Sequence, residues 1–84
     1  MKKFDFIIKD PDGLHARPAA NFCKTANEFI SDVNIIKDGE TYEGKSIMMI
    51  LSMGAVQGDK LEIVVDGIDE NEAVEELIKT LSME

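Results

Sequence analysis

The chain has 84 residues, enough for one small domain with a modest core and too few for separate catalytic and substrate domains. Seventeen acidic against nine basic residues give a formal net charge of -8, which argues against direct nucleic-acid binding because the phosphates would be repelled. The single cysteine cannot form an internal disulfide, and no run approaches the length of a membrane span, so we expect a cytoplasmic protein without membrane insertion.

The first third of the chain predicts a strand followed by a helix. Apolar and polar residues alternate from Phe4 to Lys9, as in a half-buried strand, and the turn residues of Asp10–Gly13 end it. From Ala16 to about Ile30 the apolar spacing becomes three and four residues, which predicts a helix with Pro18 in its first turn. Its core-facing residues are expected to be Ala19, Phe22, Cys23, Ala26, Phe29 and Ile30.

The remaining segments predict three strands and two helices. Short β-branched runs at 33–36 and 41–42 flank Asp38-Gly39, a pair typical of a tight hairpin turn. Ser46 is a good N-cap for a short helix over 47–51, and alternation over 60–65 predicts a fourth strand. Asp69, with Glu72 three residues later, resembles a capping box and opens a final helix. The apolar face of that helix is predicted to contain Ala73, Val74, Leu77, Ile78 and Leu81.

The order of these elements predicts the fold class. It reads strand, helix, strand, strand, helix, strand, helix, or βαββαβα. Four strands with helices gathered on one side indicate an α+β fold, an open-faced two-layer β-sandwich in which three helices cover one face of a four-stranded antiparallel sheet. We expect residues 1–84 to form a single domain of this kind.

One motif is misleading. The segment Gly39–Ser46 has the letters of the phosphate-binding loop G-x-x-x-x-G-K-[ST]. Glu40 and Glu43 would place carboxylates against the phosphates, the segment reads better as a hairpin and strand, and 84 residues cannot supply the required parallel sheet. We reject a nucleotide site there, and we expect no metal or cofactor anywhere in the chain.

The only histidine, His15, lies immediately before the first predicted helix, with Arg17 two residues later. A lone histidine in this place is most simply a surface helix cap. However, a helix N-terminus offers backbone N–H groups and the positive end of the dipole, which together attract anions. A neutral imidazole has a free lone pair and can act as a nucleophile. If it captured a phosphoryl group, the N–H groups of Ala16 and Arg17 and the Arg17 guanidinium would receive the charge.

Two further features suggest a surface for partners. Helical geometry places Arg17, Ala20, Asn21 and Lys24 opposite the core face, either as an ordinary solvated face or as a docking surface for acidic partners. Five consecutive apolar residues encircle the short helix, so some of Ile47, Met48, Met49 and Leu51 should be exposed. Extra core packing beneath a loop is the alternative for this second feature.

The segment Gly13–Ala20 reads Gly-Leu-His-Ala-Arg-Pro-Ala-Ala, and with it the chain resembles the HPr family of histidine-containing phosphocarriers of the bacterial sugar phosphotransferase system. Residues 45–48 and 51–55 are similar to the regulatory-serine segment of that family, particularly the Gram-positive type. The resemblance covers nearly the whole chain in length, element order and motif position. Met49 is a departure, because many members carry glycine or another residue there.

The resemblance implies a role for particular residues and partners. Enzyme I would phosphorylate Nδ1 of His15 with phosphate from phosphoenolpyruvate, Arg17 would steady the phosphoryl group, and the IIA component of a sugar permease would collect it. Ser46 also fits a simple N-cap. The resemblance implies that the ATP-dependent HPr kinase/phosphorylase would phosphorylate it. The phosphorylated form would be a poor substrate for enzyme I and would act as a corepressor with a catabolite control protein. The carrier would be a monomer. The implied partner-binding residues are Ala16, Ala20, Asn21, Lys24, Asn27, Ile47, Met48 and Leu51.

Three other interpretations are considered. The protein could be a pure adaptor that acts only through phosphorylated Ser46, as expected for a regulatory branch that lacks the histidine, although His15 is present here. It could be a specialised paralogue outside sugar transport. Size and acidity also fit an acyl carrier, but those are helical bundles with a Ser inside Asp-Ser-Leu, a tripeptide this sequence lacks.

Overall fold

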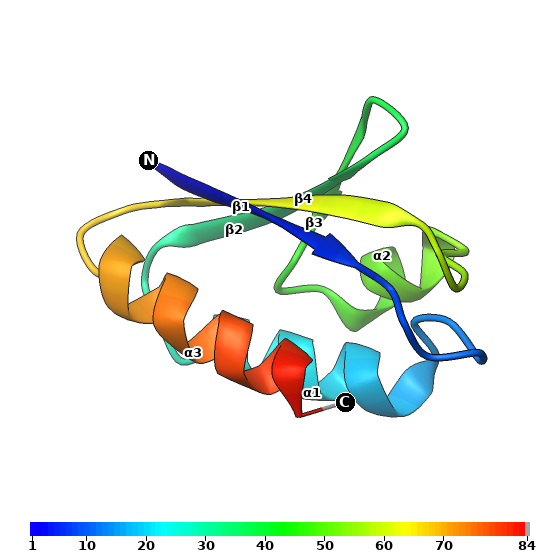
Figure 1. The fold of residues 1–84 in the computed structure, drawn as a ribbon. Coiled ribbons are helices and arrows are strands. Elements are labelled where there is room, and N and C mark those ends of the chain that lie inside the picture. The colour runs from blue at the N-terminus through cyan, green and yellow to red at the C-terminus, as the bar shows by residue number, and fades with distance from the viewer. Residues whose placement is uncertain (84) are drawn as a thin grey trace.

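The structure, a computed structural model that describes residues 1–83, contains four strands and three helices in the predicted order (Figure 1). The elements are β1 (Lys2–Ile7), α1 (Ala16–Asn27), β2 (Asp32–Lys37), β3 (Glu40–Glu43), α2 (Ile47–Ser52), β4 (Lys60–Asp66) and α3 (Glu70–Ser82).

The four strands form one antiparallel sheet in the order β1-β4-β2-β3. The register pairs Phe4 with Ile63 across β1 and β4, and Ile35 with Ile63 across β2 and β4. Because successive side chains of a strand point to opposite faces, this register gathers the apolar residues on one side of the sheet. The prediction of an antiparallel sheet is therefore confirmed, and its pairing excludes the parallel sheet of a phosphate-binding-loop ATPase.

All three helices lie on one side of the sheet, and the other face is open (Figure 1). The buried core between the two layers includes Phe22 of α1, Ile50 of α2 and Leu77 of α3, packed against Val33 and Ile63 of the sheet. The open-faced two-layer sandwich predicted from the element order is confirmed. A four-stranded sheet also rules out the helical bundle of an acyl carrier.

The hairpin between β2 and β3 forms where the sequence predicted it. Asp38 and Gly39 have φ angles of 52° and 82°, so both central residues are left-handed, as a tight primed turn requires. The region that imitates a phosphate-binding loop is thus this turn followed by β3.

No helix among residues 1–83 is long and apolar enough to cross a membrane.

Three predicted helix features are wrong. The first helix ends at Asn27 instead of Ile30, and Ile30 is 75% exposed. The Asp69 carboxylate accepts hydrogen bonds from the backbone N–H groups of Ile30 and Ser31 at 3.0 Å, which turns the chain toward β2. Asp69 therefore makes no side-chain cap on its own helix. Ile78 was assigned to the core face of α3 but is 43% exposed.

Candidate functional site

His15 lies at the junction between the loop after β1 and the first turn of α1. It is the N-cap residue of α1, and its backbone carbonyl accepts a hydrogen bond from Ala19 N at 3.0 Å. Its side chain makes no capping bond and is 36% exposed. The ring is consequently reachable from solvent at the end of a twelve-residue helix whose dipole attracts anions.

Gly13 fixes the path of the loop that leads to His15. Its φ of 71° is left-handed, and a Cβ at this position would lie 2.5 Å from the carbonyl oxygen of Ala55. Leu14 N donates to the same Ala55 oxygen at 3.1 Å, so the loop is tied to the segment that follows α2. Only glycine combines this backbone angle with so close an approach.

Asp10 lies beside His15, although its place in the sequence predicts only a turn residue. Its Oδ2 lies 3.3 Å from Nε2 of His15, and its Oδ1 accepts a hydrogen bond from Asp12 N at 2.9 Å. That N–H bond, followed by the contact with His15, holds the pKa of the Asp10 carboxyl below its ordinary value. The carboxylate is therefore ionised at neutral pH. The spacing of five residues, Asp10 to His15 across a Pro-Asp-Gly turn, is the signal that could have revealed the contact.

The residues assigned to the outer face of α1 are exposed there. Arg17 follows His15 in the first turn, and its positive charge helps to lower the pKa of Asp10, after the hydrogen bonds from Asp12 and His15. The other exposed members of this face are Ala16, Ala20, Asn21 and Lys24. Arg17 and Lys24 give a basic character to part of an otherwise acidic protein.

Ser46 caps α2 as predicted, because its Oγ accepts a hydrogen bond from Met49 N at 3.3 Å. The side chain is half-buried. The residue before it is anchored to α1, where the Asn27 amide donates to the Lys45 carbonyl at 3.0 Å. Asn27 is exposed, as a partner-binding residue must be, but its amide nitrogen is engaged in this internal contact.

Cys23, predicted as a buried small hydrophobe, is half-buried beside this contact, and its thiol donates to the Lys45 carbonyl at 3.2 Å.

The short helix α2 exposes an apolar surface, as its composition predicted. Met48 is 73% exposed, and Met49 and Leu51 are each 40% exposed. Ile50 is buried in the core, and Ile47 is partly buried against it. We call Met48, Met49 and Leu51 the α2 apolar patch. Exposed methionines adapt easily to different partner surfaces.

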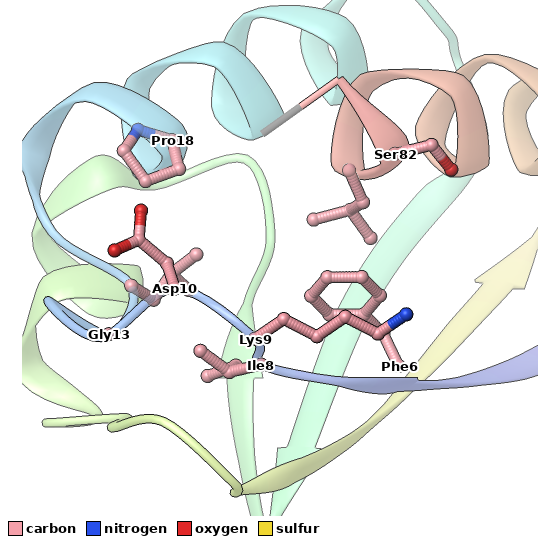
Figure 2. Close-up of a pocket in the computed structure, with 9 residues that line it drawn as sticks. Phe6, Ile8, Lys9, Asp10, Gly13, Pro18 and Ser82 are labelled. Carbon is pink, nitrogen blue, oxygen red and sulfur yellow. The ribbon is translucent and has the colours of Figure 1, made fainter.

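A cavity of about 360 Å³ lies behind the loop that carries His15 (Figure 2). It opens between the end of β1, the first turn of α1 and the last turn of α3. His15 does not line it, so the cavity does not enclose the imidazole. The residues around it are Phe6, Ile8, Lys9, Asp10, Gly13, Leu14, Pro18, Leu81 and Ser82.

Within residues 1–83, one set of three side chains has the donor atoms and proximity to hold a metal ion. Possible ligand atoms of Asp10, Asp12 and His15 all lie within 4.8 Å of one another. All three side chains, however, belong to an exposed or half-exposed loop. The Asp10 carboxylate already has hydrogen-bond contacts with Asp12 N and the His15 ring, which account for its position.

Comparison with known proteins gives the family. Residues 2–82 match the PTS-HPr family, described as the PTS HPr component phosphorylation site. A phosphocarrier protein HPr from Buchnera aphidicola subsp. Baizongia pistaciae (strain Bp) is 45% identical over 82 residues, covering 98% of this chain and 96% of the relative. The chain belongs to the HPr family. The resemblance stated from Gly13–Ala20 is thereby confirmed. As an HPr, the chain is a phosphocarrier of the phosphotransferase system and not a self-sufficient enzyme.

Solved HPr structures have the same fold. A crystal structure of HPr-C-His from Thermoanaerobacter tengcongensis, 41% identical, superposes with a TM-score of 0.92 over 98% of this chain and 92% of that chain. An HPr dimer from the same organism, also 41% identical, gives a TM-score of 0.78 over 99% and 95% of the two chains. That second structure is a dimer, and the monomer predicted for this chain stays a prediction.

Proposed function

We propose that His15 is the residue of this HPr that accepts the phosphoryl group. The observation that carries the proposal is the half-exposed imidazole at the N-terminal end of a twelve-residue helix, beside Arg17. The ring supplies the nucleophile. The helix end and the guanidinium supply the positive potential that a transferred phosphoryl group needs. No other described residue combines these features, since His15 is the only histidine.

The phosphoryl group is proposed to come from phospho-enzyme I, charged by phosphoenolpyruvate, and to pass to the IIA component of a sugar permease. The docking surface consists of the outer face of α1 and the α2 apolar patch. The α1 face contributes Arg17 and Lys24, which complement an acidic partner, and the patch contributes adaptable apolar contacts. Ala16, Ala20, Asn21, Asn27 and Ile47 are the remaining members of this surface. The transferring species is a cytoplasmic monomer.

Ser46 is proposed as a regulatory phosphorylation site for the HPr kinase/phosphorylase, with a catabolite control protein as partner of the phosphorylated form. Its hydroxyl lies at the start of α2, directly before the apolar patch. A phosphoryl group there would add about two negative charges to a surface that must meet an acidic partner. Phosphorylation of Ser46 and phosphoryl transfer through His15 therefore oppose each other.

The pure adaptor and the specialised paralogue are the competing hypotheses. An adaptor would need only Ser46, so His15→Ala would leave its cellular role, measured as growth on a transported sugar, unchanged. A specialised paralogue would accept phosphate on His15 but fail to support such growth. Phosphoryl carriage requires His15 in both the general and the specialised case.

The experiment is intact-protein mass spectrometry after incubation with phosphoenolpyruvate, magnesium and purified enzyme I. We expect one added phosphate on the natural protein and none on His15→Ala. The linkage should be labile in acid and stable in alkali, unlike a phosphoserine. Phosphate on both proteins, or on neither while a control HPr is charged, would contradict the assignment.

A further inference from the structure

We propose that Asp10 is a positioning residue for the phosphoryl acceptor: it keeps the imidazole proton on Nε2 of His15, so that the lone pair is on Nδ1. The inference deepens the proposed function and rests on it, because it concerns how His15 is prepared to accept phosphate. It assigns a role to a residue outside the Gly13–Ala20 motif, in the turn that precedes it.

The geometry begins with the contact between the two side chains. Oδ2 of Asp10 lies 3.3 Å from Nε2 of His15, at the outer end of the hydrogen-bond range. Both side chains are partly shielded, with 24% of Asp10 and 36% of His15 exposed. Figure 2 shows the Asp10 carboxylate pointing from the loop toward the first turn of α1, where Pro18 lies. The carboxylate therefore faces the helix end that carries His15.

The orientation of the carboxylate is fixed independently of the ring. Asp12 N donates to the other oxygen, Oδ1, at 2.9 Å, and Gly13 N donates to the backbone carbonyl of Asp10 at 2.9 Å. The loop itself is tied down by the bond from Leu14 N to Ala55 O. Oδ2 is thus presented to His15 by a small, hydrogen-bonded turn. Such support is what a positioning residue needs.

The chemistry of the two groups decides where the proton lies. An ionised carboxylate only accepts hydrogen bonds, and the lowered pKa of Asp10 keeps it ionised at neutral pH. The nitrogen facing it must then be the protonated one. In a neutral imidazole one nitrogen carries the proton and the other the lone pair, so Nδ1 becomes the nucleophile. The His15 side chain makes no capping bond that would favour the other tautomer.

This arrangement also serves the transfer step. The Nδ1 lone pair forms the new N–P bond while the bond between phosphorus and the donor's leaving atom breaks, and that atom keeps the electron pair. The ring retains its Nε2 proton and gains positive charge, which the Asp10 carboxylate offsets on one side. On the other side, Arg17 and the helix end meet the phosphoryl oxygens. The next acceptor reverses the step, and the ring returns to its neutral tautomer.

Nuclear magnetic resonance of the imidazole nitrogens tests the tautomer without any phosphoryl donor. In ¹⁵N-labelled protein at alkaline pH, with EDTA present, we expect a hydrogen-bonded, slowly exchanging Nε2–H proton. Asp10→Ala should abolish its protection from exchange. Asp12→Asn is the matched control, because it removes one carboxylate from the same turn but keeps the backbone N–H that binds Asp10. A protected proton that survives in Asp10→Ala would overturn the proposal.

Single-turnover transfer from phospho-enzyme I provides the second measurement. We expect Asp10→Ala and Asp10→Asn to lower the maximal rate about ten-fold, because the free energy of one charge-assisted hydrogen bond corresponds to a factor of this size. The donor concentration at half-saturation should change little. Asp12→Asn should transfer at nearly the native rate. Native rates in the Asp10 variants would also overturn the proposal. If the natural protein accepts no phosphate, the proposed function fails, and the imidazole spectrum still decides whether Asp10 holds the proton.

Discussion

The side-chain amide of Asn27 donates to the backbone carbonyl of Lys45 at 3.0 Å, and so joins the end of α1 to the residue before Ser46. The same nitrogen donates to Cys23 O at 2.8 Å. Lys45 is held a second time by its own side chain, whose Nζ donates to Phe29 O at 2.7 Å. The residue before the proposed regulatory serine is therefore held by contacts with the end of α1 and with the segment that follows it, so α1 connects the two sites.

Replacing Asn27 should disturb Ser46 more than His15. Asn27→Asp keeps the shape but removes the donor and places an oxygen beside the Lys45 carbonyl. We expect the free energy of unfolding to fall by about 1–2 kcal/mol, since the Cys23 and Lys45 carbonyls each lose a donor and the Lys45 carbonyl gains a repulsive neighbour. We also expect phosphorylation of Ser46 by an HPr kinase, measured by intact mass, to slow by a larger factor than acceptance on His15, which loses about five-fold at most from the charge added to the docking surface. Equal losses at both sites would contradict this separation.

A negative charge at Ser46 should slow transfer from enzyme I by repulsion alone. Asp and Asn are both good N-caps, so Ser46→Asp and Ser46→Asn differ mainly in charge. We expect Ser46→Asp to transfer about five-fold more slowly than Ser46→Asn, equivalent to about 1 kcal/mol of screened repulsion between surfaces. The ratio should shrink as ionic strength rises, because the screening length shortens. Equal transfer rates for the two variants at low salt would show that charge is not the mechanism.

Features that depend on a few neighbouring residues could be predicted from the sequence. Ser46 as an N-cap, the Asp38-Gly39 turn and the alternation in β4 are each encoded within a few residues, and all three are confirmed. The combination of His15 and Arg17 at a helix start likewise required only neighbouring residues. These local signals also fixed the order of elements, from which the two-layer sandwich follows.

Contacts between separate elements were not predictable in this way. Asp69 looked like a capping residue, but its carboxylate binds the chain 38 and 39 residues earlier, at Ser31 and Ile30. Whether the Asp69 carboxylate caps its own helix or binds the turn after α1 depends on how the helices pack against the sheet. The contact between Asp10 and His15 could not be predicted for a related reason. An aspartate in a turn commonly binds a backbone N–H of that turn, as Asp10 also does here.

Adding one methyl group at Gly13 should damage the loop that carries His15. Gly13→Ala combines a left-handed φ of 71° with a Cβ 2.5 Å from Ala55 O. Gly39→Ala is the control, because its φ is 82° but nothing lies within 4 Å of the added carbon. We expect about 1–2 kcal/mol of lost stability from backbone strain in the control and a larger loss in Gly13→Ala.

Urea unfolding measures this difference, and transfer from enzyme I shows whether the displaced loop impairs His15. If the two variants lose equal stability, the close approach to Ala55 does not constrain the loop.

The Asp69 carboxylate should make the free energy of unfolding depend on pH in the acidic range. The hydrogen bond from the Ser31 hydroxyl, with the bonds from Ile30 N and Ser31 N, holds the pKa of Asp69 below its ordinary value of about 3.9. Because the folded pKa is the lower one, the unfolded chain binds more protons between the two values, and stability rises with pH through that window. The contribution is complete above the unfolded pKa and is lost as pH falls through the folded one.

Urea unfolding from pH 2 to 7 measures this contribution. The gap in the free energy of unfolding between the natural protein and Asp69→Asn should close on acidification. A gap between natural protein and Asp69→Asn that stays constant down to pH 2 would mean that the Asp69 charge contributes nothing to holding the turn after α1.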